Sequence, residues 1–117
     1  LAFHRDIIRI HKQYEAFKTG SLKFLGGDYQ TMCYGRFNRE QQFVIVINND
    51  YVQRDMVWRV WPAEMERKTR LERIMFTQPD SYSLEPEIYE VNNGRVKITL
   101  PANCAVILRN IGLEKSE

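Results

Sequence analysis

The chain has 117 residues, of which 44% are hydrophobic, 27% charged and 12% aromatic, and its formal net charge is +2. This length and composition are typical of one globular domain with a single core. The near balance of charge gives no electrostatic reason to expect a nucleic-acid partner. No apolar run approaches the roughly 20 residues that cross a bilayer, so we expect no membrane partner either.

The first 19 residues are predicted to form one amphipathic helix. Apolar side chains recur at spacings of four, three, four and three residues, which places them along one side of a helix. Gly20 favours the left-handed conformation in which helices end, and Lys18 complements the helix dipole in the last turn. Such a stripe must pack on another surface, either the rest of this chain or a partner. The stripe consists of Phe3, Ile7, Ile10, Tyr14 and Phe17.

Beyond Gly20 the apolar pattern has the period of two that indicates β-strands. The run FVIVI at Phe43–Ile47 is continuously apolar and β-branched, which predicts a central strand covered on both faces. Asn93-Gly94 is a strong signal for a hairpin turn. We therefore predict an all-β fold, an antiparallel Greek-key β-sandwich of about seven or eight strands preceded by one amphipathic helix. The predicted strands are Ser21–Leu25, Thr31–Phe37, Phe43–Ile47, Tyr51–Trp61, Leu71–Thr77, Ile88–Val91, Arg95–Leu100 and Cys104–Leu108.

The cysteines and histidines are not expected to carry chemistry. Cys33 and Cys104 lie in apolar runs, where free cysteines behave as small buried hydrophobes. The alternative, a disulfide, requires them to be adjacent in space and in an oxidising compartment; free thiols favour a cytoplasmic location. His4 and His11 are two helical turns, roughly 10 Å, apart, too far to share a zinc ion. We predict no metal and no cofactor.

Two tryptophans in the stretch MVWRVWP are candidates for contact with a sugar. An exposed indole combines a flat apolar face with an N–H donor and can stack on a sugar ring. Trp58 and Trp61 are three residues apart, so in a strand they point to opposite faces. Trp58 shares its parity with Met56 and Val60 and is expected to be buried, whereas Trp61 is expected to be more exposed. The alternative for both is packing in the core or in an interface.

Three segments together resemble a known family. FHRDIIRIHKQYEAFKTGSLKFL (3–25) resembles the segment in α-amylase-family enzymes that leaves the last helix of the catalytic (β/α)8 barrel and enters the C-terminal β-domain, although Glu15 replaces the usual proline. CYGRFNREQQFVIVINND (33–50) is similar to the family's next hairpin, and NNGRVKITLPANCAVILRN (92–110) resembles its closing hairpin. Residues 52–87 fit only loosely. Among subfamilies, the pattern is most similar to cyclomaltodextrinases, neopullulanases and maltogenic amylases, or to other α-glucosidases.

This resemblance implies a domain organisation and a role. Residues 1–19 would be the terminal helix of a catalytic barrel, residues 20–113 the C-terminal β-sandwich, and residues 114–117 a polar tail. The family's catalytic carboxylates lie on barrel strands upstream, so we expect no catalytic residue here. The expected role is to pack against and stabilise the barrel of an α-glucan-acting glycoside hydrolase. The alternative is a carbohydrate-binding module that contacts α-glucans through exposed aromatic residues. An exposed stripe would also allow self-association through the helix.

Overall fold

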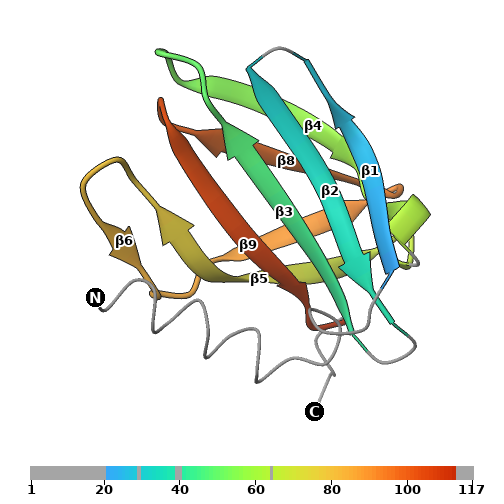
Figure 1. Cartoon of the computed structure of the whole chain (residues 1–117). Coiled ribbons are helices and arrows are strands. Elements are labelled where there is room, and N and C mark those ends of the chain that lie inside the picture. The colour runs from blue at the N-terminus through green and yellow to red at the C-terminus, as the bar shows by residue number, and fades with distance from the viewer. Residues whose placement is uncertain (1–20, 29, 39–40, 64, 113–117) are drawn as a thin grey trace.

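The computed structural model describes residues 21–28, 30–38, 41–63 and 65–112, which form an all-β, antiparallel structure (Figure 1). The prediction of this fold class is confirmed. The helix predicted over the first 19 residues lies outside the described residues. The elements, in chain order, are β1 (Ser21–Gly27), β2 (Thr31–Phe37), β3 (Gln42–Asn48), β4 (Arg54–Arg59), the 3-10 helix η1 (Trp61–Ala63), β5 (Thr69–Thr77), β6 (Tyr82–Ser83), β7 (Ile88–Asn92), β8 (Arg95–Leu100) and β9 (Cys104–Asn110).

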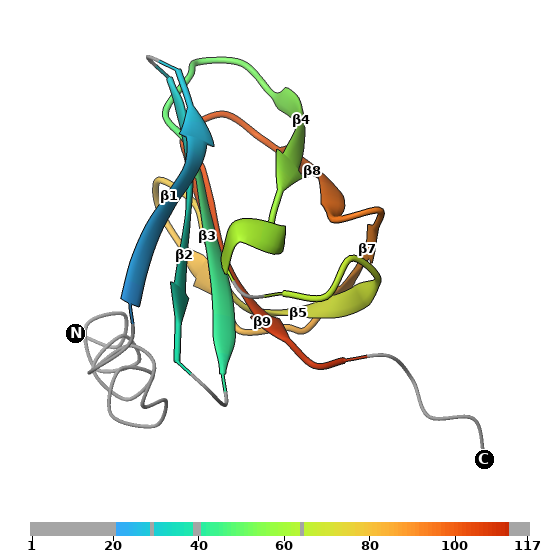
Figure 2. The same ribbon diagram turned by 90° about the vertical axis from the view of Figure 1, so that its right-hand side faces the viewer.

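The nine described strands belong to one hydrogen-bonded sheet. From edge to edge the order is β1-β2-β3-β9-β5-β7-β8-β4, and β6 pairs with β5 outside this path. A sandwich of two separate sheets was expected, but this sheet curls almost into a barrel, so that β1 and β4 approach each other (Figure 2). The sheet stays continuous because β5 pairs with β7 over Thr69–Glu72 and with β9 over Leu71–Thr77.

The inward face of the curled sheet carries the main hydrophobic core. Inward and outward residues alternate, as in β8, where Val96, Ile98 and Leu100 are buried and the residues between them are exposed. η1 lies inside the curl, and its buried Ala63 packs against Gly35 of β2. Within the described residues, no helix has the length and hydrophobicity that crossing a bilayer requires.

Strand β3 is buried on both faces, as its sequence predicts. Val44 and Val46 belong to the main core, whereas Phe43 and Ile45 point to the opposite, outward face of the sheet. There they form a second apolar cluster with Met75 of β5. The sheet is therefore apolar on its outward side around β3, β9 and β5.

The strand predicted over Tyr51–Trp61 is shorter, because other contacts hold both of its ends. On the N-terminal side, the side chain of Asn48 donates to the carbonyl of Val52 at 3.1 Å, which keeps the loop before β4 turned. On the C-terminal side, Val60 N–H donates to the carbonyl of Gly94 at 2.9 Å, and η1 follows. Strand β6 was not predicted. Its two residues lie between the strands predicted over Leu71–Thr77 and Ile88–Val91.

The hairpin turn predicted at Asn93-Gly94 is confirmed. Both residues have positive φ angles, 55° and 76°, the combination that a two-residue type I′ turn requires. The turn joins β7 to β8, which pair through Val91 with Val96 and Asn92 with Arg95.

Candidate functional site

Trp58 packs against the main core from the inward side of the sheet, and its contact with a sugar stays a prediction. It is half-buried and packs against the main core. A Cβ atom on Gly26 would lie 2.9 Å from Cζ3 of Trp58, so strand β1 approaches the indole closely. Its Nε1 is buried without a hydrogen-bond partner among the described atoms. Trp58 is therefore partly buried, less completely than Met56 and Val60, whose parity it shares.

Trp61 is the more exposed of the two tryptophans, as predicted, with 44% of its surface accessible. Its ring is nevertheless contacted by neighbours. The guanidinium carbon of Arg67 lies 5.4 Å from the ring centroid, a cation–π arrangement. The β7–β8 turn touches another part of the indole, since a Cβ atom on Gly94 would come within 2.7 Å of Cδ1. A sugar stacking on the face occupied by Arg67 would have to displace it, and glycan contact stays a prediction.

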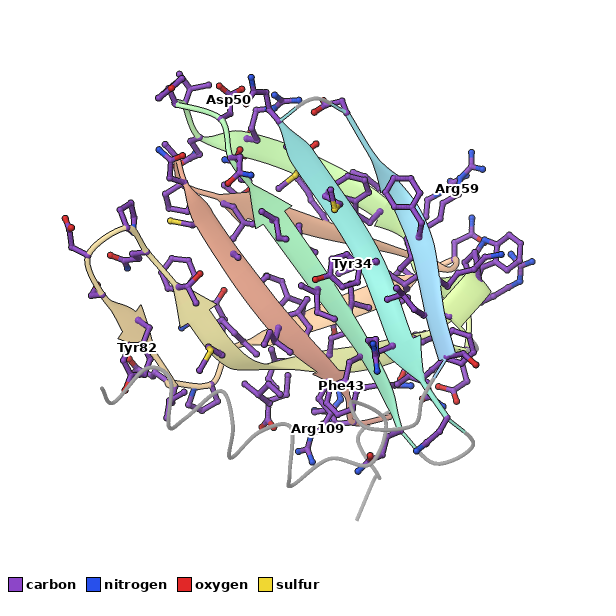
Figure 3. The ribbon with its side chains drawn as sticks, in the orientation of Figure 1. Tyr34, Phe43, Asp50, Arg59, Tyr82 and Arg109 are labelled. Atoms are coloured by element: carbon purple, nitrogen blue, oxygen red, sulfur yellow. The ribbon has the colours of Figure 1, made fainter. Side chains whose placement is uncertain are left out.

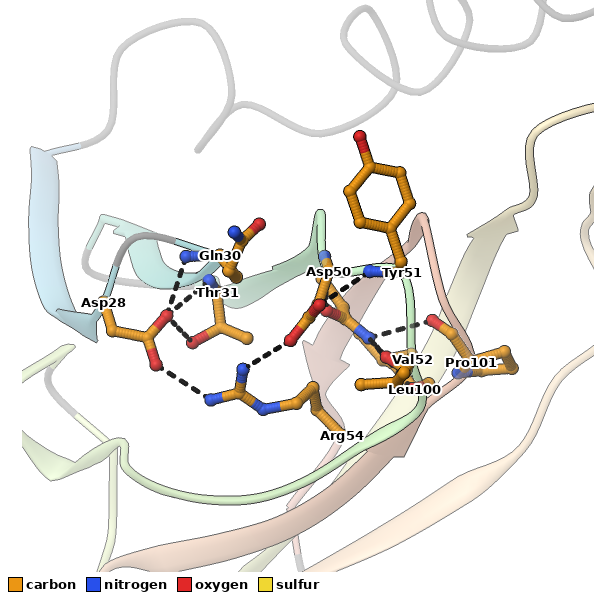
Figure 4. A network of polar contacts seen from close by, with 10 residues as sticks. Asp28, Gln30, Thr31, Asp50, Tyr51, Val52, Arg54, Leu100 and Pro101 are labelled. Atoms are coloured by element: carbon orange, nitrogen blue, oxygen red, sulfur yellow. Dashed lines mark hydrogen bonds and ion pairs between the residues drawn. The ribbon is translucent and has the colours of Figure 1, made fainter.

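A polar cluster lies at the N-terminal end of β4, the end opposite Trp61 (Figure 4). Arg54 donates from Nη2 to Asp28 and from Nη1 to Asp50, each at 2.8 Å. Asp28 follows β1 and also accepts the backbone N–H groups of Gln30 and Thr31 at 2.8 Å. The cluster therefore links the β1–β2 turn to the β3–β4 loop.

Buried Asn48 extends this cluster to the β8–β9 turn. Its side-chain nitrogen donates to the carbonyls of Val52 and Leu100 at 3.1 Å and of Pro101 at 3.0 Å. Its side-chain oxygen accepts the N–H of Asp50 at 2.9 Å. One amide side chain thus fixes the relative positions of two loops.

The electrostatics of this cluster do not suit acid–base catalysis. Hydrogen bonds from two backbone N–H groups and from Arg54 hold the pKa of Asp28 well below its usual value. The hydrogen bond between Arg54 and Asp50 likewise lowers the pKa of Asp50 and raises the pKa of Arg54. A glycoside hydrolase needs one carboxylic acid that keeps its proton near neutral pH. Here both carboxyl groups favour the ionised form.

The cysteines are free and buried, as predicted. Burial raises the pKa of Cys33 to about 12 and also raises that of Cys104. Both therefore carry neutral thiols, which are poor nucleophiles and poor metal ligands. Among the described residues no group of three or more His, Cys, Asp and Glu side chains is placed to hold a metal ion. His4 and His11 lie outside the described residues.

An exposed apolar patch on strands β1 and β2 was missed at the sequence level. Leu22, Phe24 and Met32 are 62%, 63% and 44% exposed, and we call them the edge patch. Phe24 and Met32 line a shallow hollow together with Gly27, Asp28 and Thr31. Phe24 pairs across the sheet with Tyr34, a residue of the second apolar cluster, so the edge patch continues that outward surface (Figure 3).

The sequence did contain one signal for this patch. Leu22 and Phe24 have the same parity in β1, while Leu25, the core residue, has the other. The register of β1 shifts between Phe24 and Gly26, a β-bulge that the Gly26-Gly27 pair allows, with φ angles of 152° and 159°. The strand predicted over Ser21–Leu25 ends before these glycines and therefore does not include the bulge.

No family model matches this chain, but solved structures share its fold. An α-amylase from Geobacillus thermoleovorans, complexed with acarbose, is 14% identical with a TM-score of 0.69, over 92% of this chain and 21% of that one. A noncanonic maltogenic α-amylase, AmyB from Thermotoga neapolitana, is 15% identical with a TM-score of 0.71, over 97% and 25%. An α-amylase from Anoxybacillus is 16% identical with a TM-score of 0.71, over 93% and 21%.

The sheet has the fold of a part of α-amylase structures. The chain spans about a fifth to a quarter of the length of the solved structures that it matches. The expected resemblance to the α-amylase family is therefore confirmed at the level of fold. Identities of 14–16% carry the likeness no further than that.

Proposed function

We propose that this chain is the non-catalytic C-terminal domain of a glycoside hydrolase that acts on α-glucans. The observation that carries the proposal is a match of more than nine tenths of this chain to only about a fifth of α-amylase chains. Nearly all of this chain therefore corresponds to one part of an α-amylase chain. The Asp28–Arg54–Asp50 cluster, whose two carboxyl groups have lowered pKa values and favour the ionised form, fits a role without chemistry.

In this proposal, residues 1–19 are the terminal helix of the catalytic (β/α)8 barrel, residues 20–113 form the domain with Greek-key topology, and residues 114–117 are a polar tail. The stripe Phe3, Ile7, Ile10, Tyr14 and Phe17 is buried at the junction between barrel and domain. The edge patch on β1 and β2 supports a further protein neighbour on the outward side of these strands, because exposed contiguous apolar side chains mark interaction surfaces. A cytoplasmic location belongs to the same proposal and fits the two free thiols.

The proposal is tested on the gene that encodes this chain. Its reading frame should encode a barrel upstream of Leu1. The complete gene product should hydrolyse maltooligosaccharides, whereas the 117-residue chain alone should not. Deleting residues 20–117 from the complete protein should lower its thermal midpoint and soluble yield. Sugar turnover by the short chain, or a reading frame that encodes no barrel, would contradict the proposal.

A carbohydrate-binding module is the second candidate, favoured by the 44% exposure of Trp61. Tryptophan fluorescence should then be quenched saturably by maltotriose, and Trp61→Ala should abolish the response. Cellotriose, whose linkages are β, is the matched control sugar. The first proposal, a non-catalytic C-terminal domain, predicts no response of the fluorescence to either sugar at millimolar concentration.

A further inference from the structure

The outward face of the sheet carries a second apolar cluster that the sheet itself does not cover. Phe43 and Met75 are fully buried, and Ile45 nearly so. Ile107 of β9 and Ile74 of β5 pack against them. All nine described strands belong to the one sheet, so no described strand forms a second layer over this face. Side chains on the outward face of a single sheet stay in contact with water unless another layer covers them.

The register aligns this cluster across three strands. Ile45 of β3 pairs with Ile107 of β9, and Ile107 pairs with Met75 of β5. A bulge between Arg73 and Met75 adds Ile74 to the same surface. We call this surface, from Phe43 to Ile74, the outer face. An amphipathic helix is the simplest layer that can cover such an apolar strip.

A polar margin borders the outer face at the end nearest the start of β1. Phe43 pairs with Arg109, and Arg109 pairs with Glu72, so the three lie side by side across β3, β9 and β5. Arg109 donates to Glu72 at 2.9 Å. Figure 3 shows Phe43 and Arg109 at this end of the sheet. A covering element is thus confined to the apolar strip beyond the ion pair.

The N-terminal segment starts within reach of the outer face. Ser21, the first residue of β1, pairs with Phe37, which pairs with Gln42 beside Phe43. Two strand spacings, about 10 Å, separate β1 from β3, and the three residues 18–20 span about 10 Å when extended. A helix over residues 3–17 would be about 22 Å long. That length crosses β3, β9 and β5 at about 4.8 Å per strand.

We propose that the N-terminal segment, with the stripe Phe3, Ile7, Ile10, Tyr14 and Phe17, packs as a helix on the outer face of its own chain. The occupant is this segment rather than a second copy, because a three-residue tether gives an effective concentration in the millimolar range. Phe17, next to the tether, lies toward Phe43, and Ile7 and Ile10 lie toward Ile107 and Ile74. The edge patch stays uncovered for a neighbour. In the proposed parent enzyme this helix would lie at the junction with the stripe on the domain side, but the inference itself rests only on this chain.

Isoleucine methyl groups offer a direct test on the full chain. In a sample with labelled isoleucine methyls, Ile7 and Ile10 should show nuclear Overhauser effects to Ile74 or Ile107. A mixture of differently labelled chains separates contacts within one chain from contacts between chains. Absence of these effects, or their appearance only between chains, would overturn the proposal, and the second result would identify the stripe as a self-association surface.

Two neighbouring isoleucines provide a matched pair of variants. Ile7 lies in the stripe, whereas Ile8, one residue on, points about 100° away from it on a helix. Ile7→Asp should lower the thermal midpoint by roughly 10 °C, because it places a charge against the outer face. Ile8→Asp introduces the same charge and should shift the midpoint far less. Equal shifts would overturn the proposal. If Ile7→Asp does not fold while Ile8→Asp does, the contrast supports it.

Discussion

Gly35 of β2 and Ala63 of η1 lie in contact inside the curled sheet. A Cβ atom added to Gly35 would come within 2.6 Å of the Ala63 Cβ atom and 3.4 Å of the carbonyl oxygen of Phe43. Real Cβ atoms do not approach each other this closely. The absence of a side chain at Gly35 is therefore what lets η1 sit against β2 and close the interior.

Substitution of Gly35 should destabilise the domain by overpacking. Gly35→Ala is expected to cost about 1–3 kcal/mol of unfolding free energy, and Gly35→Val more. Urea denaturation measures the loss. In the double variant with Ala63→Gly, the space that the new methyl group needs becomes free, and part of the loss should be recovered. Strict additivity of the two single effects would show that the contact does not set the position of η1.

The Asp28–Arg54–Asp50 cluster should make stability depend on acid pH. Both carboxyl groups have lowered pKa values in the folded state, so their contribution is fully present above the usual aspartate pKa of 3.8 and is lost as pH falls below it. Arg54→Met should lower the thermal midpoint at pH 7. The difference from the unmodified chain should shrink below about pH 3.

Arg59→Met is the matched control for that experiment. Arg59 is exposed at the other end of the same strand, and its replacement removes the same charge. It should change the midpoint little, and with no comparable dependence on acid pH. If both arginine variants gave the same pH profile, net charge rather than the cluster would be responsible.

Removing the Arg67 side chain should expose the face of Trp61 that it covers. Arg67→Ala is expected to cost about 0.5–1 kcal/mol and to increase quenching of tryptophan fluorescence by acrylamide. Lys68→Ala, at the exposed neighbouring position, is the control. If the domain does contact glucans through Trp61, Arg67→Ala should strengthen the response to maltotriose. An unchanged acrylamide response would show that Arg67 does not cover the ring in solution.

The strands of this fold were predictable where a local pattern determines them. FVIVI predicted a strand buried on both faces, and Asn93-Gly94 predicted its turn, because β-branching and positive φ are properties of the residues themselves. The ends of β4 were not predictable. They depend on Asn48, which donates to Val52, and on Gly94, which accepts from Val60. Contacts between segments distant in sequence leave no periodic pattern to read.

In the candidate sites too, a local pattern predicted some features, whereas contacts between segments distant in sequence determine the others. Parity correctly predicted that Trp61 is more exposed than Trp58. It could not show that Arg67 covers Trp61, because that contact joins η1 to the loop before β5. A single continuous sheet was also unpredictable, since it requires β5 to pair with both β7 and β9. Alternation along a strand fixes which side chains point inward but not which strand lies next to it.

Cys33 should be chemically silent in the folded protein. Burial raises its pKa to about 12, so the thiol stays neutral at pH 8 and should react with a thiol reagent only when the chain opens. Urea should therefore increase the reaction rate in parallel with global unfolding. Cys33→Ala should be tolerated better than Cys33→Ser, because serine leaves a buried hydroxyl in an apolar core at a cost of about 1–3 kcal/mol. Fast labelling of Cys33 without denaturant would instead indicate local opening of β2, the strand that joins the edge patch to the core.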